Sequence, residues 1–274
     1  MRINENNRPK IGLALGSGGA RGLAHIGVIK VLEANHIPID FIAGSSIGAL
    51  IGGLYAATKD INKIEEIILS GGKKQLLDLM IDPSITGGFI SGDKIEDFVS
   101  GIIDDVGFKN LKIPFAAVAT DLKTGKPVVI EKGKVSNAIR SSIAVPLVFK
   151  PIRNGKKFLV DGGLSSPVPV EIVKNMGADY VVAVNVDAHC SYHKDGDKLG
   201  LRDIVQYTFS MMRSHLSRFS SQSADVVIEP NINSHGVIGW KDFLDGKNII
   251  KKGESAAKLS IIKMKGDLKR LKVI

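Results

Sequence analysis

The sequence contains one cysteine, Cys190, among its 274 residues. A single cysteine excludes an intramolecular disulfide and a cysteine-based metal site, and it suits a reducing compartment. Long apolar runs are also missing, because no stretch approaches the roughly 18 uninterrupted apolar residues of a membrane-spanning helix. The first ten residues lack the apolar segment of a secretory signal. We therefore expect a cytoplasmic protein whose membrane contact, where it occurs, is peripheral to the inner face.

Aromatic residues make up only 5% of the chain, whereas Lys and Arg outnumber Asp and Glu by 37 to 28, for a net charge of +9. An excess of positive charge favours anionic partners, either nucleic acid or an acidic lipid surface. Because the basic residues are dispersed and few aromatic rings are present to stack on bases, we expect no nucleic-acid partner. Contact with an anionic membrane and a basic surface that serves solubility alone both fit this charge.

Apolar runs alternate with segments of helical spacing from the start of the chain. Strand, helix, strand and helix within about 60 residues predict a parallel sheet. The expected strands are 11–15, 39–43, 115–120, 127–130, 149–152, 157–160, 180–186 and 226–228. The expected helices are 20–34, 47–58, 61–69, 92–103, 135–143, 168–175, 201–219 and 254–271. No linker, repeat or charge block divides the chain, so we predict a flexible tail over residues 1–10 and one α/β domain over residues 11–274.

A serine flanked by glycines lies between an expected strand and an expected helix, in the segment Gly44-Ser45-Ser46-Ile47-Gly48. This is the setting of a nucleophile elbow, in which the strand reverses sharply into the helix and exposes the serine hydroxyl. Gly44 and Gly48 give the room for that reversal. On its own the motif also fits a plain Gly/Ser turn.

A second glycine-rich loop, Gly16-Ser17-Gly18-Gly19-Ala20-Arg21-Gly22, lies one strand and helix earlier. Adjacent parallel strands present their C-terminal ends side by side, so this loop is expected beside Ser46, with free amides for an oxyanion. Arg21 either steadies the loop or contacts an anionic substrate. The alternative is a nucleotide-phosphate loop in a binding or adaptor protein. That alternative lacks the third glycine of the dinucleotide motif and the lysine of the P-loop.

A serine nucleophile needs a base, and the residues leave two solutions open. His189 and His193 lie in a polar loop after an expected strand and would complete a Ser-His-Asp triad. Alternatively, Asp161 follows the apolar strand end Phe158-Leu159-Val160 and precedes Gly162 and Gly163, where burial would make it a base near neutral pH. The segment at Asp161 also fits a plain Asp-Gly-Gly turn, which is the third possibility.

The loop with Arg21, the Gly-x-Ser-x-Gly segment and Asp161-Gly162-Gly163 in this order resemble the patatin-like phospholipases, the bacterial members above all. The segments 13–30, 42–54, 138–146 and 158–169 carry the resemblance, which spans roughly residues 11–190. It implies a three-layer fold with a mainly parallel sheet flanked by helices, and no metal or cofactor. It also implies hydrolysis of lipid or phospholipid esters, of the phospholipase A, lysophospholipase or general lipid esterase type.

Carried over residue by residue, the resemblance makes Ser46 the nucleophile and Asp161 its base. Gly18 and Gly19 would hold the oxyanion, and Arg21 would support their loop. Ser17 stands where many family members have glycine.

Two further segments carry expectations about lipid access. Residues 254–274 place Leu259, Ile262, Leu268 and Leu271 among lysines and arginines. This basic amphipathic pattern is consistent with an interfacial helix. It also fits a terminal helix that packs on the domain with its lysines outward. The glycine-rich segment 71–92 is a candidate for part of a lid.

Overall fold

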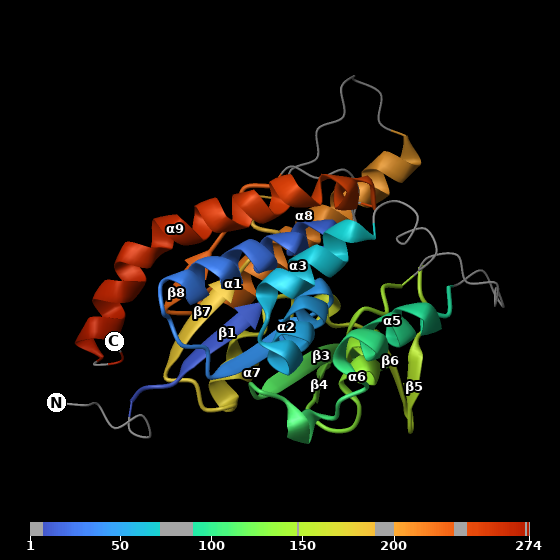
Figure 1. The fold of residues 1–274 in the computed structure, drawn as a ribbon. Helices are drawn as coiled ribbons and strands as arrows, with labels where there is room; N and C mark the ends of the chain where they lie inside the picture. The colour runs from blue at the N-terminus through green and yellow to red at the C-terminus, as the bar shows by residue number, and fades with distance from the viewer. Residues whose placement is uncertain are drawn as a thin grey trace.

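Apolar side chains occupy both faces of the central strands, which requires a sheet that is covered on both sides. The computed structural model of the chain describes residues 8–71, 90–146, 148–189, 200–232, 240–271 and 273. Its eight-stranded sheet has the order β5-β6-β3-β2-β1-β7-β8, with β4 paired to β3 (Figure 1). The strands are β1 (Ile11–Leu15), β2 (Phe41–Ser45), β3 (Phe115–Asp121), β4 (Pro127–Ile130), β5 (Ile152–Asn154), β6 (Lys157–Asp161), β7 (Tyr180–Val184) and β8 (Val226–Ile228).

The sheet is parallel from β3 to β8 and antiparallel beyond β3. Strand β2 pairs with the first half of β3 and ends with Ser45 opposite Val118. Strand β6 runs the other way and ends with Asp161 opposite Ala119. Because β4 occupies the other edge of β3, β2 and β6 lie end to end on one edge, and their C-terminal residues meet.

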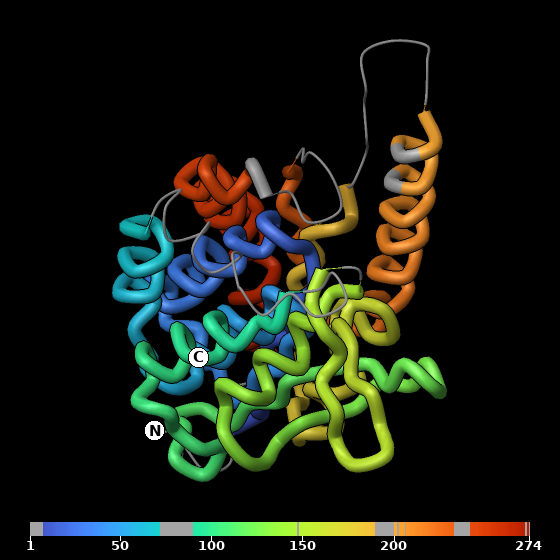
Figure 2. The backbone as a smooth tube through the Cα atoms, turned by 90° about the vertical axis from the view of Figure 1, so that its right-hand side faces the viewer, coloured from blue at the N-terminus to red at the C-terminus, as the bar shows by residue number. Residues whose placement is uncertain are grey.

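Helices cover both faces of the sheet, so the predicted mainly parallel sheet flanked by helices is confirmed (Figures 1 and 2). One face carries α1 (Ala24–Ala34), α2 (Ile47–Thr58), α3 (Ile61–Ser70), α5 (Asp93–Ile103), α6 (Val135–Ser142) and α9 (Gly246–Arg270). The opposite face is covered by α7 (Val170–Asn175). Short 3-10 turns are η2 (Gly19–Leu23), η3 (Phe108–Asn110), η4 (Gly162–Leu164) and η5 (Trp240–Asp245). Helix α8 (Leu201–Ser221) stands apart at one side (Figure 2).

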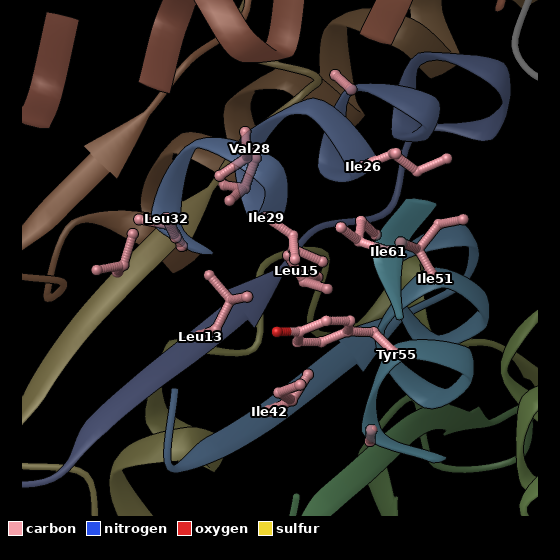
Figure 3. Packing of buried hydrophobic residues seen from close by; sticks show 14 of the residues in the cluster. Leu13, Leu15, Ile26, Val28, Ile29, Leu32, Ile42, Ile51, Tyr55 and Ile61 are labelled. Carbon is pink, nitrogen blue, oxygen red and sulfur yellow. The ribbon is translucent and has the colours of Figure 1, made fainter. Parts of the chain in front are cut away.

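The main core lies between the sheet and the α1–α2 layer. Leu13, Leu15 and Ile42 point from the strands toward Ile29 and Ile51 on the helices (Figure 3). Alternate strand positions carry small residues toward α7, which lets that helix approach the sheet closely. The large residues thus fill one layer, and the small residues fill the other.

Several element boundaries differ from the sequence expectations: the expected strands 39–43 and 149–152 are found as β2 (Phe41–Ser45) and β5 (Ile152–Asn154). The expected helix 20–34 begins as the 3-10 turn η2, which starts at Gly19, and the α-helix α1 itself starts at Ala24. The last helix starts at Gly246, eight residues earlier than expected, and continues through Gly266. Among the helices of the described segments, none has both the length and the apolar character needed to cross a membrane.

Helix α9 packs along α1, and this uses most of its apolar side. Ile250, Ala257, Ile261, Met264 and Leu268 are buried there. Of the residues expected at a lipid surface, Leu268 therefore faces the core, whereas Leu259 and Ile262 remain exposed. The two helices approach so closely that a β-carbon at Gly253 would lie 2.1 Å from the Ala24 carbonyl oxygen.

This close approach predicts opposite effects for two Gly→Ala changes in α9. Gly253→Ala should lower the free energy of unfolding by about 1–3 kcal/mol, because the methyl group meets backbone atoms that cannot give way. Gly266→Ala should raise it by about 0.5–1 kcal/mol, because no atom lies within 4 Å of that position and alanine favours the helix. Urea denaturation measures both, and equal effects of the two changes would contradict the close α1–α9 contact.

Candidate active site

Ser46 lies between β2 and α2 in a strained backbone conformation, with φ 54° and ψ −123°. Its N–H donates to the Ser142 hydroxyl at 2.9 Å, and that hydroxyl donates to the Val118 carbonyl at 2.5 Å. The flanking glycines are required by close contacts. A β-carbon at Gly44 would lie 2.4 Å from the Gly48 carbonyl oxygen, and one at Gly48 would lie 2.2 Å from the Leu15 carbonyl oxygen. The strained turn is therefore held by β3 on one side and β1 on the other.

Asp161 reaches Ser46 across 115 positions of sequence, because β2 and β6 meet end to end on β3. The Ser46 hydroxyl donates to Asp161 Oδ2 at 2.5 Å. The other carboxylate oxygen, Oδ1, accepts from the Gly163 N–H at 2.8 Å. Gly162 lets the turn pass against the Val118 carbonyl, 2.1 Å from where its β-carbon would stand. One carboxylate oxygen is thus fixed by the turn, and the other faces the serine.

Burial raises the pKa of Asp161 to about 6, because the charged carboxylate loses water. The hydrogen bonds from Ser46 and Gly163 and the positive charge of Arg213 act in the opposite direction. At neutral pH the carboxylate is ionised, yet its proton affinity is far above that of an ordinary aspartate. This combination suits a group that accepts a proton from a serine hydroxyl.

The glycine-rich loop after β1 leaves two amides without acceptors. The N–H groups of Gly16 and Ser17 donate to the carbonyls of Val184 and Pro167, at 3.0 and 2.8 Å. Those of Gly18 and Gly19 have no acceptor among the described residues. Gly18 also packs against the segment that follows β7, since a β-carbon there would lie 2.3 Å from Val186 Cγ2. The loop therefore offers donors at the same sheet edge as Ser46.

Arg21 is wholly buried and paired with Asp187, so it does not extend to a substrate. Its Nε donates to Asp187 Oδ1 at 3.0 Å, and its Nη2 lies 2.7 Å from the same oxygen. Arg213 of α8 binds Asp187 from the other side, through Nε at 2.8 Å and Nη2 at 2.7 Å. Burial opposes the charge of Asp187, but the two guanidinium groups outweigh it and hold the pKa below its usual value.

Sequence reasoning missed three polar residues that support this site. Asp187 follows β7 at the edge where the two loops lie, so its position after a buried strand was an available signal. His25 is buried, and its Nε2 donates to the Gly16 carbonyl at 2.8 Å. Burial lowers the pKa of His25 to about 4, so it is neutral at physiological pH. Ser142 gave no local signal, because its role depends on α6 packing beside β3.

Of the two histidines proposed for a triad, the structure describes His189. His189 is exposed and forms no hydrogen bond with either residue, and His193 lies outside the described residues. The lid candidate falls mostly on residues 72–89, which are also outside them. Within the described segments, no three His, Cys, Asp or Glu side chains converge in the manner of metal ligands.

Comparisons with known proteins agree with this geometry at the level of family. An uncharacterized NTE family protein of Mycobacterium tuberculosis is 41% identical over 188 residues, which cover 68% of this chain and 52% of that protein. Neuropathy target esterase of Drosophila melanogaster is 34% identical over 184 residues, covering 64% of this chain and 13% of the fly protein. The chain thus spans about half the length of the mycobacterial relative.

The fold is also similar to that of a solved structure. The crystal structure of VipD from Legionella pneumophila matches with a TM-score of 0.52 and 14% identity, over 92% of this chain and 67% of VipD. The model of the family "Patatin-like phospholipase" matches residues 13–174, which include Gly18, Ser46 and Asp161. The chain therefore belongs to the patatin-like phospholipase family.

Proposed function

We propose that the chain is a serine acyl hydrolase of lipid esters, with Ser46 as nucleophile and Asp161 as base. The observation that carries the proposal is the 2.5 Å hydrogen bond from the Ser46 hydroxyl to Asp161 Oδ2, beside the unpartnered amides of Gly18 and Gly19. Family membership supports the lipid substrate class. The name of the Drosophila melanogaster relative, neuropathy target esterase, supports ester hydrolysis.

In the first half of the proposed reaction, Asp161 Oδ2 accepts the proton as Ser46 Oγ attacks the ester carbonyl carbon. The carbonyl oxygen becomes negative and accepts hydrogen bonds from the Gly18 and Gly19 amides. The tetrahedral species then collapses, the C–O bond to the alcohol breaks, and Asp161 returns the proton to the leaving oxygen. An acyl ester on Ser46 remains.

In the second half, water attacks the acyl carbon and Asp161 takes its proton. Collapse breaks the bond to Ser46 Oγ, which regains the proton, and a fatty acid leaves.

The exposed position of His189 does not support a triad. The nucleotide-binding alternative does not explain why Ser46 and Asp161 are paired. Arg21 acts as a positioning residue for the oxyanion loop through Asp187.

The dyad predicts that Ser46→Ala and Asp161→Asn each lower kcat/KM for a short-chain nitrophenyl ester by about a thousandfold or more. Ser46→Ala should also abolish labelling by a fluorophosphonate, because no nucleophile remains. The matched control is His189→Ala, which should retain both activities. Labelling of the Ser46→Ala protein at wild-type level would refute the nucleophile, and loss of activity in His189→Ala would favour the triad.

The raised pKa of Asp161 predicts the pH dependence of the reaction. The base must be ionised, so kcat/KM should be constant near neutral pH and fall about tenfold per pH unit below a pKa of about 6. The acid limb should persist in His189→Ala. It should move to higher pH in Arg213→Gln, because the positive charge that favours the carboxylate is lost. An acid limb near the pKa of an ordinary aspartate would contradict a desolvated base.

The buried ion pair predicts a large stability effect without contact with substrate. Asp187→Asn leaves the Arg21 charge buried with no counter-charge, and should lower the free energy of unfolding by about 3–5 kcal/mol. Asp97→Asn, a matched change at an exposed position, should change it by less than about 0.5 kcal/mol. Urea denaturation of both variants measures the difference, and similar midpoints would show that Arg21 does not depend on Asp187.

A further inference from the structure

Helix α8 turns its polar side inward and its apolar side outward. Four serines recur at helical spacing on the inner side and are between 1% and 8% exposed: Ser210, Ser214, Ser217 and Ser221. The opposite side carries apolar residues that are between 47% and 80% exposed. We call this set the α8 apolar face: Leu201, Ile204, Val205, Phe209, Met211, Met212 and Phe219.

Polar contacts attach α8 to the rest of the protein. Arg213 binds Asp187, and Arg218 Nη2 donates to the Ala188 carbonyl at 2.6 Å. The Ser220 hydroxyl accepts from the Val168 N–H at 3.2 Å. No described helix or strand packs along α8 as α1 packs along α9, and Figure 2 shows the helix standing beside the domain. The attachment therefore needs nothing from the apolar face.

Several exposed apolar side chains on one side of a helix mark a site of contact with a partner or a membrane. An isolated exposed leucine would need no explanation, but six members of the α8 apolar face lie between Leu201 and Met212, and Phe219 follows two turns later. No helix or strand of the described residues packs along this side.

We infer that the α8 apolar face inserts into the interfacial region of an anionic lipid surface. This inference rests on the proposed function, because a lipid ester hydrolase meets its substrate in such a surface. Charge favours lipid over a second copy of the chain, since two copies with net charge +9 repel each other, whereas anionic headgroups attract the protein.

The position of α8 beside the candidate active site also supports a lipid surface as the partner of the α8 apolar face. Arg213, near the middle of the helix, binds Asp187, and Asp187 also binds Arg21 at the end of the oxyanion loop. Arg213 is close enough to lower the pKa of Asp161 by its charge. Insertion of α8 therefore brings the candidate active site to the lipid surface.

Helix α9 has the basic amphipathic sequence but a smaller free apolar surface. Its buried residues face α1, and Leu259 and Ile262 are the pair left outward in its central part. Ile262 is 84% exposed and Met212 is 66% exposed, so the two helices offer matched positions for the same substitution.

The test compares vesicle binding with hydrolysis of a soluble ester. Wild type, Val205→Glu, Met212→Glu and the control Ile262→Glu are floated with phosphatidylcholine vesicles that contain phosphatidylglycerol. Both α8 variants should bind at least about tenfold more weakly than wild type, because a carboxylate replaces an inserted apolar group. Ile262→Glu, which makes the same change of charge, should bind as wild type does. All four proteins should hydrolyse the short-chain ester equally.

Three outcomes would overturn the inference. They are wild-type binding by both α8 variants, absence of vesicle binding by the wild-type protein, and a loss in Ile262→Glu equal to that in Met212→Glu. Sedimentation velocity without lipid gives a fourth: a wild-type dimer that Met212→Glu dissociates would assign the face to a second copy. Fluorophosphonate labelling keeps the two proposals separate. Labelling at Ser46 without vesicle binding refutes only the docking surface, and vesicle binding without labelling refutes only the hydrolase.

Discussion

Strand β3 holds two other strands end to end on one edge, and the candidate site depends on this arrangement. Parallel β2 ends with Ser45 opposite Val118, and antiparallel β6 ends with Asp161 opposite Ala119. Ser46, the residue that follows β2, donates a hydrogen bond to Asp161. A shift of either strand by one residue would turn its last side chain to the other face of the sheet. The pairing of Ser46 with Asp161 is therefore a consequence of strand register, and the Val118 carbonyl reinforces it by accepting from Ser142.

Buried charge connects the second part of the site to the first. Arg21, Asp187 and Arg213 join the loop after β1, the end of β7 and helix α8, three segments far apart in sequence. Removal of water makes each of these charges costly alone, so the three must remain together. The same cluster acts on Asp161: Arg213 favours its ionised form, and Asp187 opposes it. The proton affinity of Asp161 thus reflects the assembly of the whole sheet edge.

Local features of the site could be predicted from the sequence, and long-range ones could not. The strand-turn-helix at Ser46 and the glycine loop at Gly18 are set by neighbouring residues, and strand adjacency alone puts them side by side. The hydrogen bond between Ser46 and Asp161 requires the antiparallel register of β6 on β3. The spacing of apolar residues in the sequence does not reveal that register. Asp187 was passed over although it follows a buried strand, because its partners Arg21 and Arg213 lie elsewhere in the chain. The family resemblance supplied Asp161, where the residues alone left three interpretations open.

The orientation of helix α8 could not be predicted from its sequence pattern. Helical spacing of apolar residues shows that a helix has an apolar side, but not whether that side turns inward. In α8 the inward side carries serines, and hydrogen bonds attach this side to the rest of the protein. Arg213 donates to Asp187, and Ser214 and Arg218 donate to the Ala188 carbonyl. The polar side chains that attach α8 to the protein and the α8 apolar face therefore lie on opposite sides of one helix. A charge placed on the outer side leaves the Asp187 cluster intact, so a substitution there tests the proposed surface attachment without altering the groups proposed to act at Ser46.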